Sequence, residues 1–190
     1  MAACLTGSLA AQAQHDPWAP GKAPFFLTVH VGGGAGMVAV GGGVQLARQK
    51  LEPELLVGYV PSRFSSKPLA IFTFKTTYLP IRAALGDQWQ ASGGVGGYLN
   101  YTLGATIRNS KDPSNYTPGY YWFSTRVRTG LFLTPRLTYA GQTTGPNPAR
   151  VAAYAEVGTN DLYLLSRLPN KGGISTTDIV TLGFGSKVGW

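Results

Sequence analysis

Charged residues are scarce in this chain of 190 residues, where Asp, Glu, Lys and Arg together make up 13%. That is about half the share found in an ordinary soluble domain. A chain with so few charges normally needs a large dry core, yet hydrophobic residues reach only 44% and mean hydropathy is +0.00. Glycine, with 26 copies, and Thr, Ser, Asn and Gln replace the missing charges. This mixture favours a sheet with one apolar face and one polar, uncharged face.

Cysteine, histidine and long apolar runs are also nearly absent. The single cysteine, Cys4, excludes an internal disulfide framework. Two histidines, one cysteine and no clustered carboxylates make a poor ligand set, so we expect no metal. The glycine-rich stretches "GGGAG" and "GGVGG" do not have the spacing of phosphate or dinucleotide loops, so we expect no cofactor. No run approaches the roughly 18–20 apolar residues of a membrane-spanning helix.

The charges that are present give a net charge of +8. This balance could indicate nucleic-acid binding, but the Lys and Arg residues are scattered, without a basic run or an RNA-binding motif. We therefore expect no nucleic-acid partner.

The first residues have a composition different from the rest. "LTGSLAAQAQ" ends in small residues, as the tail of a secretory signal does, although a basic n-region is missing and the apolar region is short. We interpret residues 1–14 as a truncated signal peptide and residues 15–190 as a single β-barrel domain.

Period-2 alternation of apolar and polar residues recurs in eight places, separated by turn-forming residues. The alternating segments span residues 25–32, 37–47, 54–60, 69–78, 89–103, 120–133, 150–165 and 178–190. A strand that crosses a membrane needs roughly 9–11 residues, and bacterial single-chain barrels have an even number of strands. The pattern predicts an all-β fold, an eight-stranded antiparallel up-and-down transmembrane β-barrel, with residues 134–149 as a long connection.

The polar faces of these segments decide which side of the barrel faces water. In a soluble barrel the outer positions would carry many Lys, Glu and Asp residues, whereas here Gly, Ser, Thr, Asn and Gln predominate with isolated charges. Such a face suits a narrow lumen, and the apolar face then meets lipid. The ionisable residues that parity places in the lumen are His30, Glu54, Lys75, Arg126, Arg128, Glu156 and Lys187.

Charges enclosed in an eight-stranded barrel must pair or hold water, because its interior is just wide enough for side chains to fill. One interpretation is a structural ion-pair network that plugs the barrel. The other is a polar path for a small solute, which four bases against two acids would bias toward anions.

The end of the chain resembles the C-terminal signal of Gram-negative outer-membrane β-barrels. Leu182, Phe184, Val188 and Trp190 alternate, and the aromatic Trp190 is the last residue. Segments such as "LLVGYVPSRF" and "NDLYLLSRLPN" also look like small barrels of the Bacteroidota that have no assigned activity. The resemblance implies an outer-membrane location, contact with membrane lipid, and recognition of the closing strand by the barrel-assembly machinery.

Basic residues recur in the loops that we assign to the outer end of the barrel. Lipopolysaccharide carries phosphates at that level, which basic side chains hold by charge-assisted contacts. Ordinary solvated loops are the alternative, because surface charges contribute little by themselves. The residues concerned are Arg63, Lys67, Arg108, Lys111, Arg167 and Lys171.

We expect a non-enzymatic role in the envelope, in surface interaction or as a narrow pore. One alternative is a lipid A acyltransferase or deacylase, small outer-membrane barrels that use a His with a Ser. His30 would then need a hydroxyl such as that of Ser62, Ser65 or Ser124 within reach. The His–Ser spacing of the deacylases and the Asp-Ser step of the palmitoyltransferases are absent. A soluble lipocalin-like carrier, with the apolar faces inside, is a third possibility.

Overall fold

The structure is a computed structural model that describes residues 25–65, 67–104, 126–141, 149–167, 175 and 177–189. Eight strands follow in chain order: β1 Phe25–Gly32, β2 Val38–Val44, β3 Leu51–Val60, β4 Leu69–Ala84, β5 Trp89–Leu103, β6 Val127–Ala140, β7 Arg150–Asn160 and β8 Thr181–Gly189.

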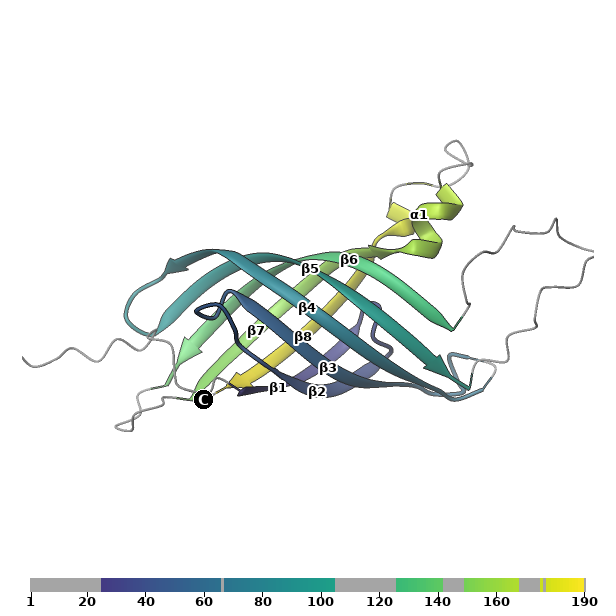
Figure 1. Ribbon diagram of the computed structural model, residues 1–190, viewed down its shortest axis with the longest axis horizontal. Helices are drawn as coiled ribbons and strands as arrows, with labels where there is room; N and C mark the ends of the chain where they lie inside the picture. Colours follow the sequence, from purple (N-terminus) through teal and green to yellow (C-terminus); the bar gives the residue numbers. More distant parts are fainter. Residues whose placement is uncertain are drawn as a thin grey trace, which may run out of the picture.

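The strands form one closed barrel in which each strand pairs antiparallel with its neighbour in sequence. β1 closes the barrel against β8, where Thr28 lies opposite Lys187 and Val31 opposite Phe184. The predicted eight-stranded, all-antiparallel barrel is therefore confirmed, and closure leaves no unpaired edge between β1 and β8. Figure 1 shows the strands strongly tilted, as closure of a barrel requires.

Two short helices precede β8: α1 spans Asp161–Arg167, and η1 is a 3-10 turn at Thr177–Ile179. The sequence pattern placed residues 161–165 in a strand, which is wrong, because β7 ends at Asn160. The Asn160 side chain accepts a hydrogen bond from the backbone N–H of Tyr163 at 3.0 Å. This contact caps the first turn of the helix. No helix in the described part of the chain has the length and apolar character needed to cross a membrane.

The alternation of strand directions puts the connections at two ends. The β1–β2 and β3–β4 loops and α1 lie at one end, which we call the α1 end. β8 finishes at the opposite end, together with the β4–β5 hairpin (Figure 1). β4 and β5 are the longest strands, with 16 and 15 residues, and their register shifts between Tyr78 and Ile81, around Pro80.

β6 differs most from the prediction. The alternation assigned residues 120–133 to a strand and 134–149 to a connection, but the strand continues through Ala140. Arg136 pairs with Ser92 on β5 and with Tyr154 on β7. Residues 134–140 of the expected connection are thus part of the sheet, and the order of strands is sequential throughout.

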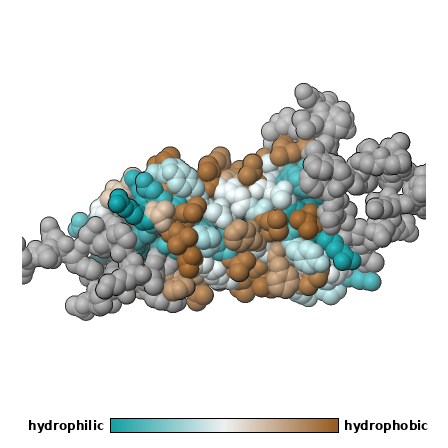
Figure 2. All heavy atoms as spheres, viewed as in Figure 1, coloured by the Kyte–Doolittle hydropathy of each residue, from teal (hydrophilic) through white to brown (hydrophobic). Residues whose placement is uncertain are grey.

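Large apolar side chains cover the outside of the barrel. Phe72, Phe74 and Phe184 are about half exposed or more, at 46%, 50% and 60%. In the space-filling view, hydrophobic residues spread over the middle of the wall and hydrophilic ones gather nearer the two ends (Figure 2). We call this surface the apolar belt. Its members on β1, β3, β6 and β8 include Leu27, Val29, Leu55, Val57, Leu131, Leu133, Leu182 and Val188.

The interior is filled by rings that lie against glycines. A Cβ atom added to Gly185 would overlap the ring of Tyr154, and one added to Gly183 would come within 2.8 Å of His30 Cε1. Gly130 leaves the same kind of space for Tyr98. Glycine on the inner face therefore makes room for aromatic side chains in a barrel of small diameter.

Candidate functional site

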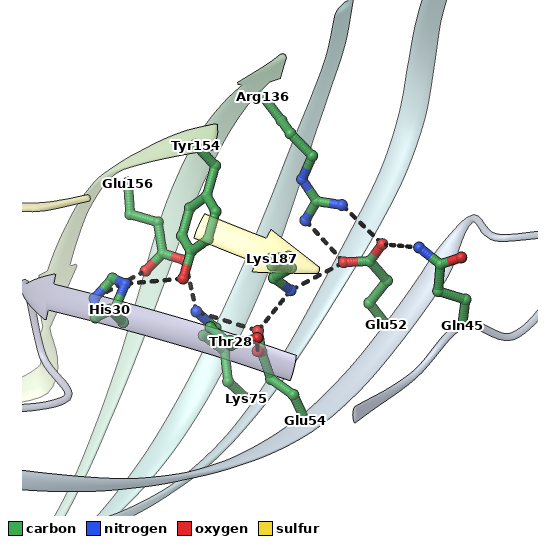
Figure 3. Close-up of polar contacts among 10 residues, drawn as sticks. All are labelled: Thr28, His30, Gln45, Glu52, Glu54, Lys75, Arg136, Tyr154, Glu156 and Lys187. Atoms are coloured by element: carbon green, nitrogen blue, oxygen red, sulfur yellow. Dashed lines mark hydrogen bonds and ion pairs between the residues drawn. The ribbon is translucent and has the colours of Figure 1, made fainter. Parts of the chain in front are cut away.

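Glu52, at the second position of β3, is the centre of one half of a polar network in the barrel interior. Arg136 on β6 donates two hydrogen bonds of 2.7 Å, from Nη1 to Oε1 and from Nη2 to Oε2 of this carboxylate. Lys187 on β8 adds a contact of 3.0 Å to Oε2, and Gln45 donates to Oε1 at 2.9 Å. The Glu52 side chain is 0% exposed, so its charge is compensated entirely by protein donors (Figure 3).

Glu54, two residues further along β3, continues the network toward the α1 end. Lys187 donates to its Oε1 at 2.9 Å, and Thr28 on β1 donates to Oε2 at 2.8 Å. Lys75 on β4 lies 3.2 Å from Glu54 Oε1 and 2.7 Å from Glu156 Oε1 on β7. Both lysines thus bridge two carboxylates each, so the charges alternate in sign along the network.

His30 and Tyr154 close the network at β1 and β7. His30 Nδ1 is 3.0 Å from the Tyr154 hydroxyl, and His30 Nε2 is 3.8 Å from Glu156 Oε2. The Tyr154 ring also faces the Nζ atoms of Lys75 and Lys187, whose distances to its centroid are 5.2 and 5.6 Å. One tyrosine ring therefore lies against two ammonium groups in the middle of the barrel.

The network is balanced in charge. Its ion pairs join three carboxylates, Glu52, Glu54 and Glu156, with three cations, Lys75, Arg136 and Lys187. The sequence-based count of four bases against two acids is wrong, because it omits Glu52 and Arg136. The paired network therefore gives no reason to expect a preference for anions. Six strands contribute to the contacts, namely β1, β3, β4, β6, β7 and β8. The contacts therefore link six of the eight strands across the barrel interior.

Five of the seven predicted lumenal residues are buried inside the barrel: His30, Glu54, Lys75, Glu156 and Lys187. Arg128 faces the interior near the α1 end, with its side chain 26% exposed and Nη1 at 3.5 Å from Asp161 Oδ2 on α1. Arg126 is exposed and immediately precedes β6, which begins at Val127. Residues 120–125 of the expected strand lie outside the described residues.

Glu52 and Arg136, the most closely paired residues of the network, were not predicted. The sequence pattern assigned Glu52 to a turn and Arg136 to a connection, because Pro53 and Pro135 interrupt the two segments. Proline is unusual inside a sheet, yet both prolines lie within strands here. The signal that could have found them is the two-residue period of a strand, which puts alternate residues on the same face. Glu52 is two residues from Glu54, and Arg136 is two residues from the buried Thr134.

The predicted lipopolysaccharide contacts can be placed only in part. Arg63 and Lys67 are exposed in the β3–β4 loop at the α1 end. Arg167 is the last residue of α1, and the structure describes its backbone but not its side chain. Arg108, Lys111 and Lys171 fall outside the described residues.

In the closing strand, Leu182, Phe184 and Val188 all lie on the exposed face of β8, as the alternation predicts, while Trp190 is outside the described residues. Within the described residues, no group of three or more His, Cys, Asp or Glu side chains is arranged to hold a metal ion.

The sequence matches no protein-family model, and neither curated proteins nor solved structures show significant similarity to it.

Proposed function

We propose that this protein is an outer-membrane β-barrel with an interior closed by ion pairs, which serves a non-enzymatic role in the envelope or in surface interaction. The observation that carries the proposal is the inverted distribution of side chains. Leu55 is 67% exposed on β3, while its neighbours Glu54 and Leu56 are 2% and 1% exposed. An outer wall of aliphatic and aromatic residues is costly in water and stable in hydrocarbon.

This distribution is the reverse of what a soluble lipocalin-like carrier needs. A carrier encloses its ligand among inward apolar side chains, whereas the interior here holds a network of ion pairs and hydroxyl groups beside a few buried apolar and aromatic residues. The apolar belt has exposed large side chains on β1, β3, β4, β6 and β8, whereas a soluble monomer normally exposes apolar residues singly or in small patches.

The closed network favours a structural barrel over a pore. Glu52 and Glu54 each contact three donor side chains at 2.7–3.2 Å. Glu156 contacts Lys75 at 2.7 Å and lies 3.8 Å from His30. A solute that crosses the lumen would have to break several of these contacts at once. Planar-bilayer recording at two salt concentrations tests this point. We expect silent bilayers, and a steady salt-dependent conductance would support the narrow-pore alternative instead.

Acyl-transfer chemistry at His30 is the alternative from another class. His30 is 1% exposed, and its partners are Tyr154 and Glu156, which does not resemble a serine nucleophile beside its base. Ser124, one of the hydroxyls considered, lies outside the described residues. Mass spectrometry of lipid A from cells with and without the protein separates the two classes. We expect unchanged acylation, and a new or missing acyl chain would support the enzyme.

The basic loop residues Arg63 and Lys67 fit contact with lipopolysaccharide phosphates in this proposal, because they lie at the end opposite the end of β8. The exposed apolar row of β8 likewise fits a signal read by the barrel-assembly machinery. An outer-membrane location of the Gram-negative, Bacteroidota type accords with both.

The proposal as a whole is tested by the behaviour of the protein in detergent. We expect it in the membrane fraction, extracted only with detergent, and with a gel mobility that changes on heating, because a folded barrel resists sodium dodecyl sulfate until it is heated. Full solubility in buffer without detergent would contradict the membrane location.

A further inference from the structure

The outer wall of the barrel is hollowed by a groove across β4, β5, β6 and β7. Its volume is about 740 Å³, within the range of about 300–1,000 Å³ typical of small-molecule sites. Two neighbouring cross-strand rows of outward residues make most of the lining. One row is Thr76, Gly97, Leu131 and Thr159, and the other is Tyr78, Val95, Leu133 and Val157.

Because Gly97 has no side chain, the first row projects less far from the barrel wall than the second. A Cβ atom at Gly97 would meet only Gly130 O and Leu131 Cδ2, both at 3.4 Å, and the backbone there has no positive φ. Nothing in the backbone therefore requires glycine at this outward position. The adjacent inward Gly96 differs, since a Cβ there would overlap the ring of Phe132.

One end of the groove lies at the α1 end of the barrel. Ile179 and Val180, at the junction of η1 and β8, line it there, and η1 contacts α1. Three consecutive residues of α1, Leu162, Tyr163 and Leu164, are 38–42% exposed although they are apolar. Because α1 also contacts β6 and β7, these side chains extend the apolar belt beyond the strands, next to the groove.

We propose that this groove holds an acyl chain of a lipid in the outer leaflet, more firmly than the rest of the wall holds lipid. The inference rests on the proposed function, because it places the α1 end at the outer leaflet. The groove is continuous with the apolar belt, and the lining carries no charge; its side-chain polarity is that of two threonines and one tyrosine. A protein partner of ordinary size would need a polar rim and about one hydrogen bond per 100–200 Å², which this lining does not offer.

The preference of an acyl chain for the groove over the rest of the wall arises from van der Waals contact rather than from removal of water. Lipid surrounds the whole barrel, so a chain in the groove gains no hydrophobic transfer energy over a chain elsewhere. It does gain atoms within van der Waals range on several sides at once, and such contacts are small individually and large together.

The test is photolabelling in vesicles of phosphatidylcholine that contain a trace of phosphatidylcholine with a diazirine on one acyl chain. Labelled residues are identified by peptide mass spectrometry. The chain supplies matched references on the other side of the barrel: Leu131 and Leu55 are both 67% exposed, and Leu133 and Leu27 are both 59% exposed. We expect several-fold more label on Leu131 and Leu133 than on Leu55 and Leu27.

Gly97→Leu fills the groove and is expected to reduce labelling of Leu131 and Leu133 to the level of the references. Gly93→Leu is the matched control. It lies on the same outward face of β5, outside the groove lining, and the nearest atom to an added Cβ is 4.0 Å away. This variant should keep the labelling of the parent protein, and heat-modifiable mobility reports whether both variants fold.

Other outcomes identify which claim fails. Equal labelling of all four leucines would overturn the groove while leaving the membrane barrel intact. No label on any of them would overturn the membrane barrel as well. Less label on Leu131 and Leu133 than on the references, together with a change of oligomeric state in Gly97→Leu, would mean that a second copy of the protein occupies the groove, and the lipid site would be wrong.

Discussion

At the scale of single residues, each inward side chain must fit the space left by its neighbours and must also satisfy its polar groups. Tyr154 illustrates both constraints, because its ring lies against Gly185 while its hydroxyl contacts His30. Neither neighbour is close to Tyr154 in sequence. A period-2 pattern therefore identifies which residues point inward, but it does not identify which of them meet across the lumen.

The consecutive glycines Gly96 and Gly97, which face inward and outward on β5, give a direct test of this packing. A methyl group at Gly96 would overlap Phe132 and lie 2.6 Å from the carbonyl oxygen of Thr76. We expect Gly96→Ala to lower the free energy of unfolding by about 1–3 kcal/mol, as overpacking does. Gly97→Ala should change it by no more than about 1 kcal/mol. Urea unfolding in vesicles measures both, and equal effects would contradict the described interior.

Glu52 forms ion pairs with two cations, Arg136 and Lys187, and its carboxylate is fully buried. Glu52→Gln leaves Arg136 and Lys187, which are 8% and 4% exposed, without a carboxylate that they share. We expect a loss of about 3–5 kcal/mol in the free energy of unfolding, the usual cost of breaking a buried pair by removing one partner.

The matched control for Glu52→Gln is Asp87→Asn, at an exposed acid in the β4–β5 turn. We expect this change to stay within about 0.5 kcal/mol, as surface substitutions usually do. If the two variants unfold at the same urea concentration, the buried network does not contribute as the structure indicates.

At the scale of whole elements, the number, direction and facing of the strands were predictable, and some of their ends were not. The alternation identified all eight strands and the exposed face of β8. It lost the first residues of β3 and the second half of β6, because Pro53 and Pro135 each interrupt a run. The alternation also extended β7 into α1, because the apolar residues of "DLYLL" fit the two-residue period of a strand and the 3.6-residue period of a helix.

β6 offers the clearest test at this scale. If residues 134–140 belong to the strand, their amide groups pair with β5 and β7 and should exchange slowly with deuterium. The β3–β4 loop, residues 61–68, serves as the fast-exchanging reference. Hydrogen exchange of peptides measured by mass spectrometry decides the point. Exchange of 134–140 as fast as that of the loop would restore the long connection expected from the sequence.

At the scale of the molecule, closure of the sheet and inversion of the side chains act together. Sequential antiparallel pairing, completed by β1 with β8, satisfies the backbone of the wall, which a sheet in hydrocarbon requires. In the membrane location that we propose, the outward faces need no polar groups, and the buried charges of the interior lie where they can pair. The scarcity of charge, the abundance of glycine and the alternating pattern all fit this arrangement.

The central claim is that the outward face of the strands meets hydrocarbon. Nitroxide labels at positions 54–57 of β3, on a parent with Cys4 replaced by serine, test it most directly in phosphatidylcholine vesicles. Labels at positions 55 and 57 should collide frequently with oxygen, which dissolves in lipid, and rarely with a water-soluble nickel chelate. Labels at positions 54 and 56 should be protected from both. Frequent collision of the nickel chelate with labels at 55 and 57 would place that face in water and contradict the account.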